Sequence, residues 1–132
     1  MAVDATDLGA LPIFGTLSPE ELHGLASGAD RIEVDGPGVE LTRQGDFGHS
    51  VFAVLEGTAQ VLVEGRTVRD LSPGDVFGEV AVLSSGRRTA TVVSTTRMVL
   101  ASFFKRDVWE IEKTNPAFAD ALRNLRAVDE AR

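Results

Sequence analysis

Residues 77–92 read FGEVAVLSSGRRTATV, and this stretch lies between two runs of strand-forming residues. The segment from Glu79 to Leu83 is long enough for about one helical turn, and the first backbone N–H groups of a helix have no partner inside it. These N–H groups and the helix dipole favour an anion. Arg88 follows in the same stretch, and its planar guanidinium matches the oxygens of a phosphate. The stretch therefore predicts a compact site for one phosphate group.

Glu79 is an unexpected residue at a phosphate site, because a carboxylate repels a phosphate. A carboxylate is, however, a good acceptor for a sugar hydroxyl group. We therefore expect Glu79 to bind the 2′-hydroxyl of a ribose and to select against deoxyribose. In an enclosed site, loss of this partner leaves a polar group unpaired at a cost of about 1–3 kcal/mol.

The residues around this stretch are typical of β-structure. Between residues 30 and 105, short runs of Val, Leu, Phe and Thr are separated at regular intervals by Gly, Asp and Pro. Strands are predicted at residues 31–34, 40–42, 50–55, 59–63, 67–71, 88–93 and 98–104. Between two of these runs, Glu64-Gly65 predicts a tight hairpin turn. Many short strands at regular spacing predict a sandwich or a barrel.

Helices are predicted on both sides of the β-rich region. Residues 18–21 read SPEE, a helix start with Ser at the cap, Pro at the first position and Glu at the third, and Gly28 is expected to end this helix. Asn115-Pro116 is expected to separate two C-terminal helices, the second with an apolar stripe. The predicted organisation is one domain, residues 1–132, with a helical part at 1–28, a β-barrel at 30–105 that contains the stretch 77–91, and C-terminal helices at 106–132.

The composition narrows the possible partners. The chain has 132 residues, no cysteine and a net charge of −7. The absence of cysteine excludes disulfides and thiolate metal sites, and the acidic balance argues against broad binding to nucleic acid. No apolar run approaches the length of about 20 residues that crosses a bilayer. We therefore expect a cytoplasmic protein with no nucleic-acid partner and no membrane insertion.

The stretch at residues 77–92 resembles the phosphate-binding cassette of cyclic nucleotide-binding domains, which occur in protein kinases, ion channels and bacterial catabolite activator-type regulators. The family pattern is Phe-Gly-Glu-x-Ala-x-Leu, then a short spacer, then Arg-(Ala/Ser/Thr)-Ala, and residues 77–83 and 88–90 follow it in the same order. The resemblance implies a mainly β fold with flanking helices. It would be an eight-stranded β-roll or jelly-roll barrel, with N-terminal helices and two C-terminal helices.

The resemblance also implies a role for each residue of the cassette. Arg88 would pair with the cyclic phosphate and Glu79 with the ribose. Thr89 is compatible with cGMP as well as with cAMP as the ligand, and it does not decide between the two nucleotides. The expected ligand-binding residues are Gly78, Glu79, Val80, Ala81, Arg88, Thr89, Ala90 and, as an apolar wall for the base, Val61. Candidates for a lid over the base are Leu122 and Leu125.

The implied function is that of a regulatory sensor that binds cAMP or cGMP, is not an enzyme and needs no metal or other cofactor. Movement of the C-terminal helices would carry the signal to a protein effector or to a fused output domain. Arg87 departs from the family pattern, which often has Pro at this position, and is expected to add positive charge and to loosen the loop.

Two other classes of function stay open at this point. The chain could be a degenerate barrel that acts as a protein-interaction module without binding a nucleotide. It could also be an enzyme on a cupin-like barrel, but such sites need several histidine ligands, and His23 and His49 are the only histidines of the chain. No plausible Ser-His-Asp set emerges from the sequence either.

Overall fold

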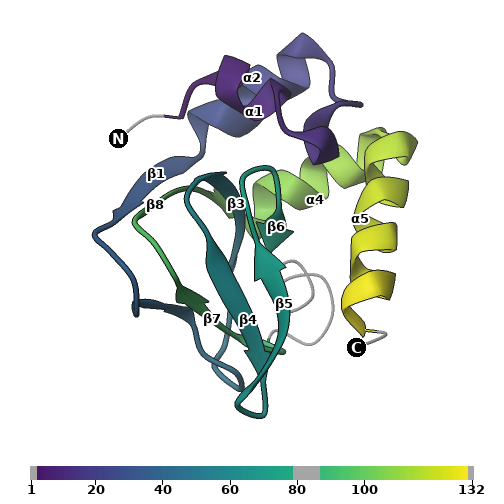
Figure 1. Ribbon diagram of the computed structural model, residues 1–132. Coiled ribbons are helices and arrows are strands. Elements are labelled where there is room, and N and C mark those ends of the chain that lie inside the picture. Colours follow the sequence, from purple (N-terminus) through teal and green to yellow (C-terminus); the bar gives the residue numbers. More distant parts are fainter. Residues whose placement is uncertain (1–2, 79–86, 131–132) are drawn as a thin grey trace.

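The computed structural model describes residues 3–78 and 87–130, with side chains described as far as residue 124. Eight strands and five helical segments lie within these residues (Figure 1). The strands are β1 (Asp30–Val34), β2 (Glu40–Thr42), β3 (Ser50–Glu56), β4 (Ala59–Val63), β5 (Arg66–Leu71), β6 (Val76–Phe77), β7 (Thr91–Ser94) and β8 (Met98–Phe104). The helices are α1 (Ala5–Gly9), the 3-10 helix η1 (Pro12–Phe14), α2 (Pro19–Ser27), α4 (Lys105–Thr114) and α5 (Pro116–Glu130).

The strands form two antiparallel sheets of four strands each, with the orders β1-β8-β3-β6 and β2-β7-β4-β5. The mainly β roll with flanking helices is therefore confirmed. The predicted barrel is not closed, because within the described residues no hydrogen-bonded ladder joins an edge of one sheet to an edge of the other. Two of the edge strands, β2 and β6, have only three and two residues, which is too short to extend a ladder around the corner.

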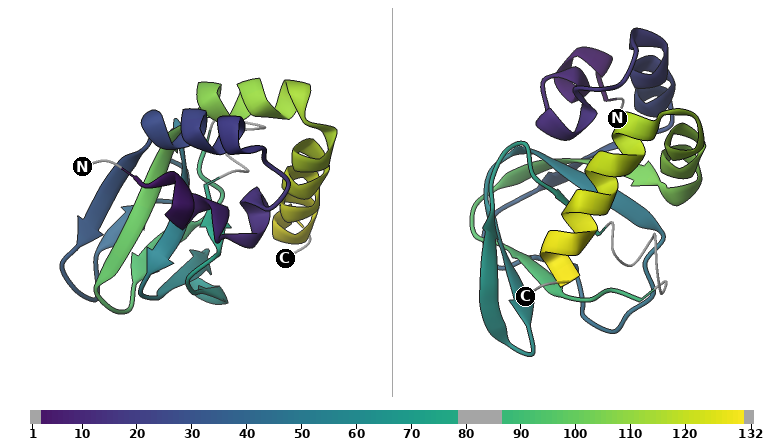
Figure 2. Two further views of the ribbon diagram at one scale, coloured as in Figure 1. Left: turned by 90° about the horizontal axis from the view of Figure 1, so that it is seen from above. Right: turned by 90° about the vertical axis from the view of Figure 1, so that its right-hand side faces the viewer.

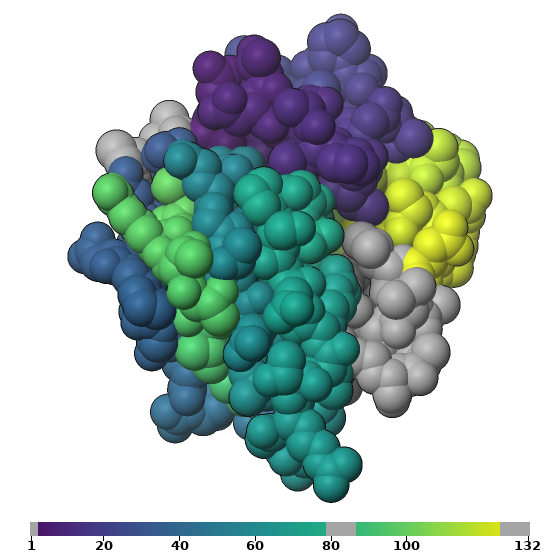
Figure 3. All heavy atoms as spheres, in the orientation of Figure 1, coloured from purple at the N-terminus to yellow at the C-terminus, as the bar shows by residue number. Residues whose placement is uncertain are grey.

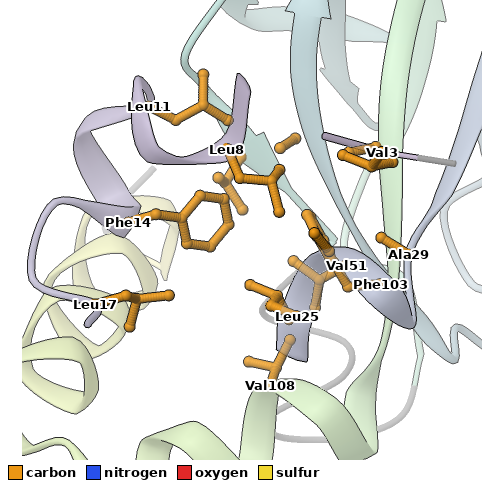
Figure 4. Close-up of a cluster of buried hydrophobic side chains, with 14 of the residues drawn as sticks. Val3, Leu8, Leu11, Phe14, Leu17, Leu25, Ala29, Val51, Phe103 and Val108 are labelled. Carbon is orange, nitrogen blue, oxygen red and sulfur yellow. The ribbon is translucent and has the colours of Figure 1, made fainter. Parts of the chain in front are cut away.

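The first sheet is covered on both faces, and this explains the nearly continuous apolar runs of β3 and β8. Val51 and Phe103 belong to a cluster that the helices cover, which Figure 4 shows from close by. Val54 and Leu100, on the opposite face, belong to a second cluster inside the roll. Successive residues of a strand point to opposite faces, so a strand buried on both sides must be apolar throughout.

The helices gather at one end of the roll and cover one face of the first sheet (Figures 1 and 2). Figure 3 shows the N-terminal segment lying across the top of the strands in that view, with α5 beside it. The rings of Phe14, in η1, and Phe118, in α5, stack with their centroids 6.1 Å apart. In the described part of the chain, no helix is long and apolar enough to span a bilayer.

Most of the local predictions are confirmed. The backbone N–H of Glu21 donates to Ser18 Oγ over 3.1 Å, and the Ser18 N–H donates to Glu21 Oε1 over 2.8 Å, so the predicted helix start is a capping box. Glu64 and Gly65 have φ values of 51° and 77°, as a two-residue hairpin turn of the primed type requires.

Two strand predictions need correction. Strand β7 begins at Thr91 and not at Arg88, because the backbone of Arg88 pairs with the turn after β2 instead of with a neighbouring strand. Strand β6 was not predicted. It has only two residues, Val76 and Phe77, which pair with Ala53 and Phe52 of β3, and so short a strand carries no periodic pattern.

Candidate functional site

The backbone of Arg88 is fixed by the turn that follows β2. The Arg88 N–H donates to the carbonyl oxygen of Asp46 over 2.6 Å, and the Gly45 N–H donates to the carbonyl oxygen of Arg88 over 2.9 Å. Nearby, the N–H of Gln44 donates to Thr91 Oγ1 over 3.0 Å. A turn more than forty positions earlier in the chain therefore holds Arg88 through both its backbone N–H and its backbone carbonyl.

The side chain of Arg88 turns inward and is oriented by backbone carbonyl groups. The residue is only 9% exposed. Its Nη1 donates to the carbonyl oxygens of Ser50, over 3.0 Å, and Gly78, over 3.2 Å, and its Cζ lies 5.5 Å from the centroid of the Phe52 ring. These two carbonyls fix the orientation of the guanidinium.

Two glycines make room for this guanidinium. A Cβ atom added to Gly48 would lie 2.3 Å from Nε and 2.4 Å from Cζ of Arg88. A Cβ added to Gly78 would lie 2.5 Å from Nη1 of Arg88, and Gly78 also has a φ of 87°, which side chains rarely tolerate. Since real Cβ atoms essentially never come closer than 3.0 Å to a heavy atom of a residue that is not a chain neighbour, both positions must be glycine while the arginine stays where it is.

A cavity of about 300 Å³ adjoins Arg88. The residues that line it are Glu40, Leu41, Thr42, Arg43, Asp46, Phe47 and Arg88. Its wall is partly built by Thr42, which is buried and whose hydroxyl donates to the carbonyl oxygen of Ala90 over 3.1 Å. The volume is at the lower end of the range of about 300–1,000 Å³ that small-molecule sites occupy. A buried, oriented guanidinium beside such a cavity can bind a small anion.

Among the described residues predicted for the site, Arg88 alone lines this cavity. Val61 and Ala90 are buried in the cluster inside the roll, at 4% and 8% exposure, and Gly78 contacts Arg88 directly. Thr89, next to Arg88, is exposed. Three other predicted residues, Glu79, Val80 and Ala81, lie outside the described residues.

The two residues predicted to form a lid are in α5. Leu122 is 1% exposed and belongs to the cluster covered by the helices, together with Phe14 and Phe118, and not to the cluster inside the roll. In this conformation it contributes to the helical core. The side chain of Leu125 lies outside the described part.

The sequence pattern indicated only a turn at Gly48 and did not predict Gly48, Ser50 or Phe52 as site residues, although all three contact Arg88 or limit its position. Gly48 follows the Gly45-Asp46 turn closely in sequence, which was the one available signal. The carbonyl of Ser50 and the ring of Phe52 belong to an ordinary strand, β3, and no local pattern shows that they face an arginine from another part of the chain.

The two histidines lie on different elements. His23 is exposed on α2, and His49 is exposed just before β3. Among the described residues, no group of three or more His, Asp or Glu side chains is arranged to hold a metal ion.

The chain is similar to proteins of known family and structure. The family model of the cyclic nucleotide-binding domain matches residues 36–115 of the chain, which is more than half of its length. The chain belongs to this family. Family members are regulatory domains, and the two facing antiparallel sheets with flanking helices are the fold of the solved structures to which this cyclic nucleotide-binding domain is similar.

Relatives of this cyclic nucleotide-binding domain occur in several kinds of protein. It is 35% identical to the cAMP-dependent protein kinase regulatory subunit of Colletotrichum orbiculare over 100 residues, which cover 74% of this chain and 25% of that protein. The Thermus thermophilus catabolite activator protein has a similar structure, with a TM-score of 0.75 and 31% identity over 91% of this chain and 59% of that one. So does the regulatory subunit of a cAMP-independent protein kinase A from Trypanosoma brucei, with a TM-score of 0.81 and 26% identity over 91% of this chain and 43% of that one. The chain thus spans about a quarter of the length of the kinase subunit that it matches.

Proposed function

We propose that this domain binds a cyclic nucleotide, cAMP or cGMP, and acts as a non-catalytic sensor. The observation that carries the proposal is the buried guanidinium of Arg88, which two backbone carbonyls orient and two glycines accommodate beside a cavity. Family membership makes a cyclic nucleotide the first ligand to consider. A ring-closed phosphate has a single negative charge, which suits one arginine.

The remaining contacts of the proposed site come from the cassette. Glu79 would accept a hydrogen bond from the ribose 2′-hydroxyl, and backbone N–H groups of Gly78, Val80 and Ala81 would complete the cradle around sugar and phosphate. Val61 and Ala90, which are buried inside the roll, would contact the base. The exposed side chain of Thr89 would be free to contact a guanine, so both nucleotides must be tested.

Signalling would use the C-terminal helices and a protein effector or a fused output domain in the cytoplasm. In the present conformation Leu122 is part of the helical core. For Leu122 to cover the base, α5 would have to leave that core, and the ligand would have to bind the rearranged state more tightly. This model requires no metal and no cofactor beyond the nucleotide.

Isothermal titration with cAMP, cGMP, 5′-AMP and 2′-deoxy-cAMP tests the proposal. Replacing Arg88 with Ala removes a charge-assisted contact, and we expect the affinity for the cyclic nucleotide to fall by about tenfold to hundredfold or more. Arg97→Ala is the control, since it removes the same charge from an exposed position in the turn between β7 and β8. Equal affinities of the Arg88→Ala variant and the unaltered protein would refute the site.

A second candidate function is a protein-interaction module that binds no nucleotide. The observation that favours it is the similarity to the regulatory subunit of a cAMP-independent protein kinase A, at a TM-score of 0.81, because the same fold then occurs in the subunit of a kinase that does not depend on cAMP. If neither cAMP nor cGMP binds or raises the melting temperature of the unaltered domain, this second function is favoured.

A further inference from the structure

Arg87 precedes Arg88, the residue proposed to bind the phosphate, and it makes two well-defined contacts with the turn after β2. Its Nη1 donates to the carbonyl oxygen of Gly45 over 2.9 Å. Its Cζ lies 4.2 Å from the centroid of the Phe47 ring, within the range of a cation–π contact. The backbones of Phe47 and Arg87 also form an isolated β-bridge. The sequence predicted that an arginine at this position adds positive charge and loosens the loop, most of which lies outside the described residues; the contacts seen here attach residue 87 itself to the turn after β2.

The same turn holds Arg88. Asp46 accepts the N–H of Arg88, and Gly45 donates to its carbonyl oxygen. One residue after Phe47, Gly48 lies against Nε and Cζ of the Arg88 side chain. A displacement of the turn therefore moves the surface on which the guanidinium rests. We call the group formed by Gly45, Asp46, Phe47, Arg87 and Arg88 the clasp.

Packing against apolar neighbours alone does not explain the exposed position of the Phe47 ring. It is 65% exposed, the largest exposure among the exposed large hydrophobic residues of the described chain, and it also lines the cavity beside Arg88. Because one face of this ring lies under a guanidinium, it has an electrostatic partner in place of an apolar one.

We propose that Arg87 is a positioning residue, which sets the location of the Arg88 guanidinium through its contacts with Phe47 and Gly45. The inference rests on the proposed binding of a cyclic nucleotide by Arg88. It assigns to Arg87 and Phe47 a joint effect on affinity, with no contact between either side chain and the phosphate.

A double-mutant cycle distinguishes positioning from direct attraction of the anion. The variants are Phe47→Leu, Arg87→Met and the double variant, titrated with cAMP at low and high salt. We expect each single variant to weaken cAMP binding by roughly threefold to tenfold, and the double variant to be no weaker than the poorer single variant, since both remove the same contact. Arg87→Lys retains a cation above the ring and should recover part of the affinity.

The competing result has a different pattern. If Arg87 attracts the phosphate by charge alone, Arg87→Met weakens binding strongly at low salt and little at high salt, while Phe47→Leu has no effect. That pattern would overturn the proposal, as would additive effects of the two single variants. Circular dichroism and melting temperature establish that each variant is folded.

A measurement without nucleotide keeps this inference separate from the proposed function. In the free protein, solvent exchange of the Arg88 Nε–Hε proton, followed by nuclear magnetic resonance, reports how firmly the guanidinium is held. We expect Phe47→Leu and Arg87→Met to accelerate this exchange, whereas the control Arg97→Met leaves it unchanged. If the unaltered protein binds no nucleotide but the exchange responds, the proposed function fails and the clasp stands. Unchanged exchange in both variants would contradict the clasp whether or not nucleotide binds.

Discussion

At the scale of single residues, the site depends on how the guanidinium of Arg88, only 9% exposed, is held in one orientation. Arg88 is held by carbonyl oxygens of Ser50 and Gly78, and its long side chain fits only because Gly48 and Gly78 have no Cβ. Carbonyl oxygens accept from the N–H groups of a guanidinium and so orient it. The glycines are therefore as much a part of the site as the arginine.

Gly48→Ala tests this steric requirement. Gly48 is the cleaner of the two positions, because no positive φ adds backbone strain there. The added methyl group must displace the Arg88 side chain, and we expect cAMP affinity, measured by isothermal titration, to fall by at least about tenfold. Gly24→Ala, where an added Cβ meets nothing within 4 Å, is the control and should stabilise α2 by up to about 1 kcal/mol. Unimpaired binding of cAMP by Gly48→Ala would show that the Arg88 side chain can bind the nucleotide from a different position.

At the scale of elements, one side-chain network joins the start of α2 to the junction of α4 and α5. Asn115 Nδ2 donates to Glu21 Oε1 over 3.0 Å and to the carbonyl oxygen of Thr16 over 3.1 Å, while Asn115 Oδ1 accepts the N–H of Phe118 over 3.1 Å. The same Glu21 oxygen accepts the N–H of Ser18. Any rotation of α5 away from the N-terminal helices must strain or break these bonds.

This network predicts a dependence of stability on acid. The hydrogen bond from the Ser18 backbone lowers the pKa of Glu21 below its ordinary value of 4.5, and side-chain hydrogen bonds from Asn115 and Ser18 act in the same direction while burial opposes them. Because the folded pKa is the lower one, the stabilisation by the carboxylate is complete above about pH 4.5 and is lost as the pH falls through the folded value.

We expect the difference in unfolding free energy between the unaltered protein and Glu21→Gln to be positive at pH 7 and to shrink below pH 4.5. Urea unfolding at a series of pH values measures it. Glu20→Gln removes a charge from the same first turn of α2 and is the matched control. A difference that stays constant from pH 7 to pH 3 would mean that ionisation of Glu21 does not stabilise the folded state.

At the scale of the whole molecule, the apolar core is divided by the first sheet. One cluster fills the roll and includes Val61 and Ala90, and the other joins the sheet to α1, η1, α2, α4 and α5. Strands β3 and β8 contribute to both clusters. The site and the helices are thus separated by one layer of backbone, through which a displacement on one face can reach the other.

Leu122→Ala tests the division. Leu122 is 1% exposed in the helical cluster, and truncation of a buried leucine costs about 2–5 kcal/mol. We expect a loss of unfolding free energy of that size in urea, with Val68→Ala, at a position 41% exposed, changing little. A loss of cAMP affinity without a loss of stability would show that Leu122 acts on the ligand and not in the core.

Part of this structure follows from local sequence. The capping box at Ser18 and the turn at Glu64-Gly65 involve residues three or fewer positions apart, and the strands and helices carry periodic patterns, so six of the seven predicted strands were located correctly to within one residue. The cassette motif likewise predicts Arg88 as the cation of the candidate site. These features depend on residues that are close together in the sequence, so the order of the amino acids determines them directly.

The tertiary structure alone decided what surrounds that cation. Arg88 is surrounded by residues that lie about forty positions away in the chain: the carbonyl of Ser50, the side-chain-free position of Gly48 and the turn at Gly45-Asp46. The Phe47 ring under Arg87 is equally distant in sequence. No periodic pattern encodes such pairings, because they exist only once β2, β3 and β7 have taken their places in two different sheets. Chemistry can be assigned to a residue from its type, but the orientation of its charge depends on long-range packing.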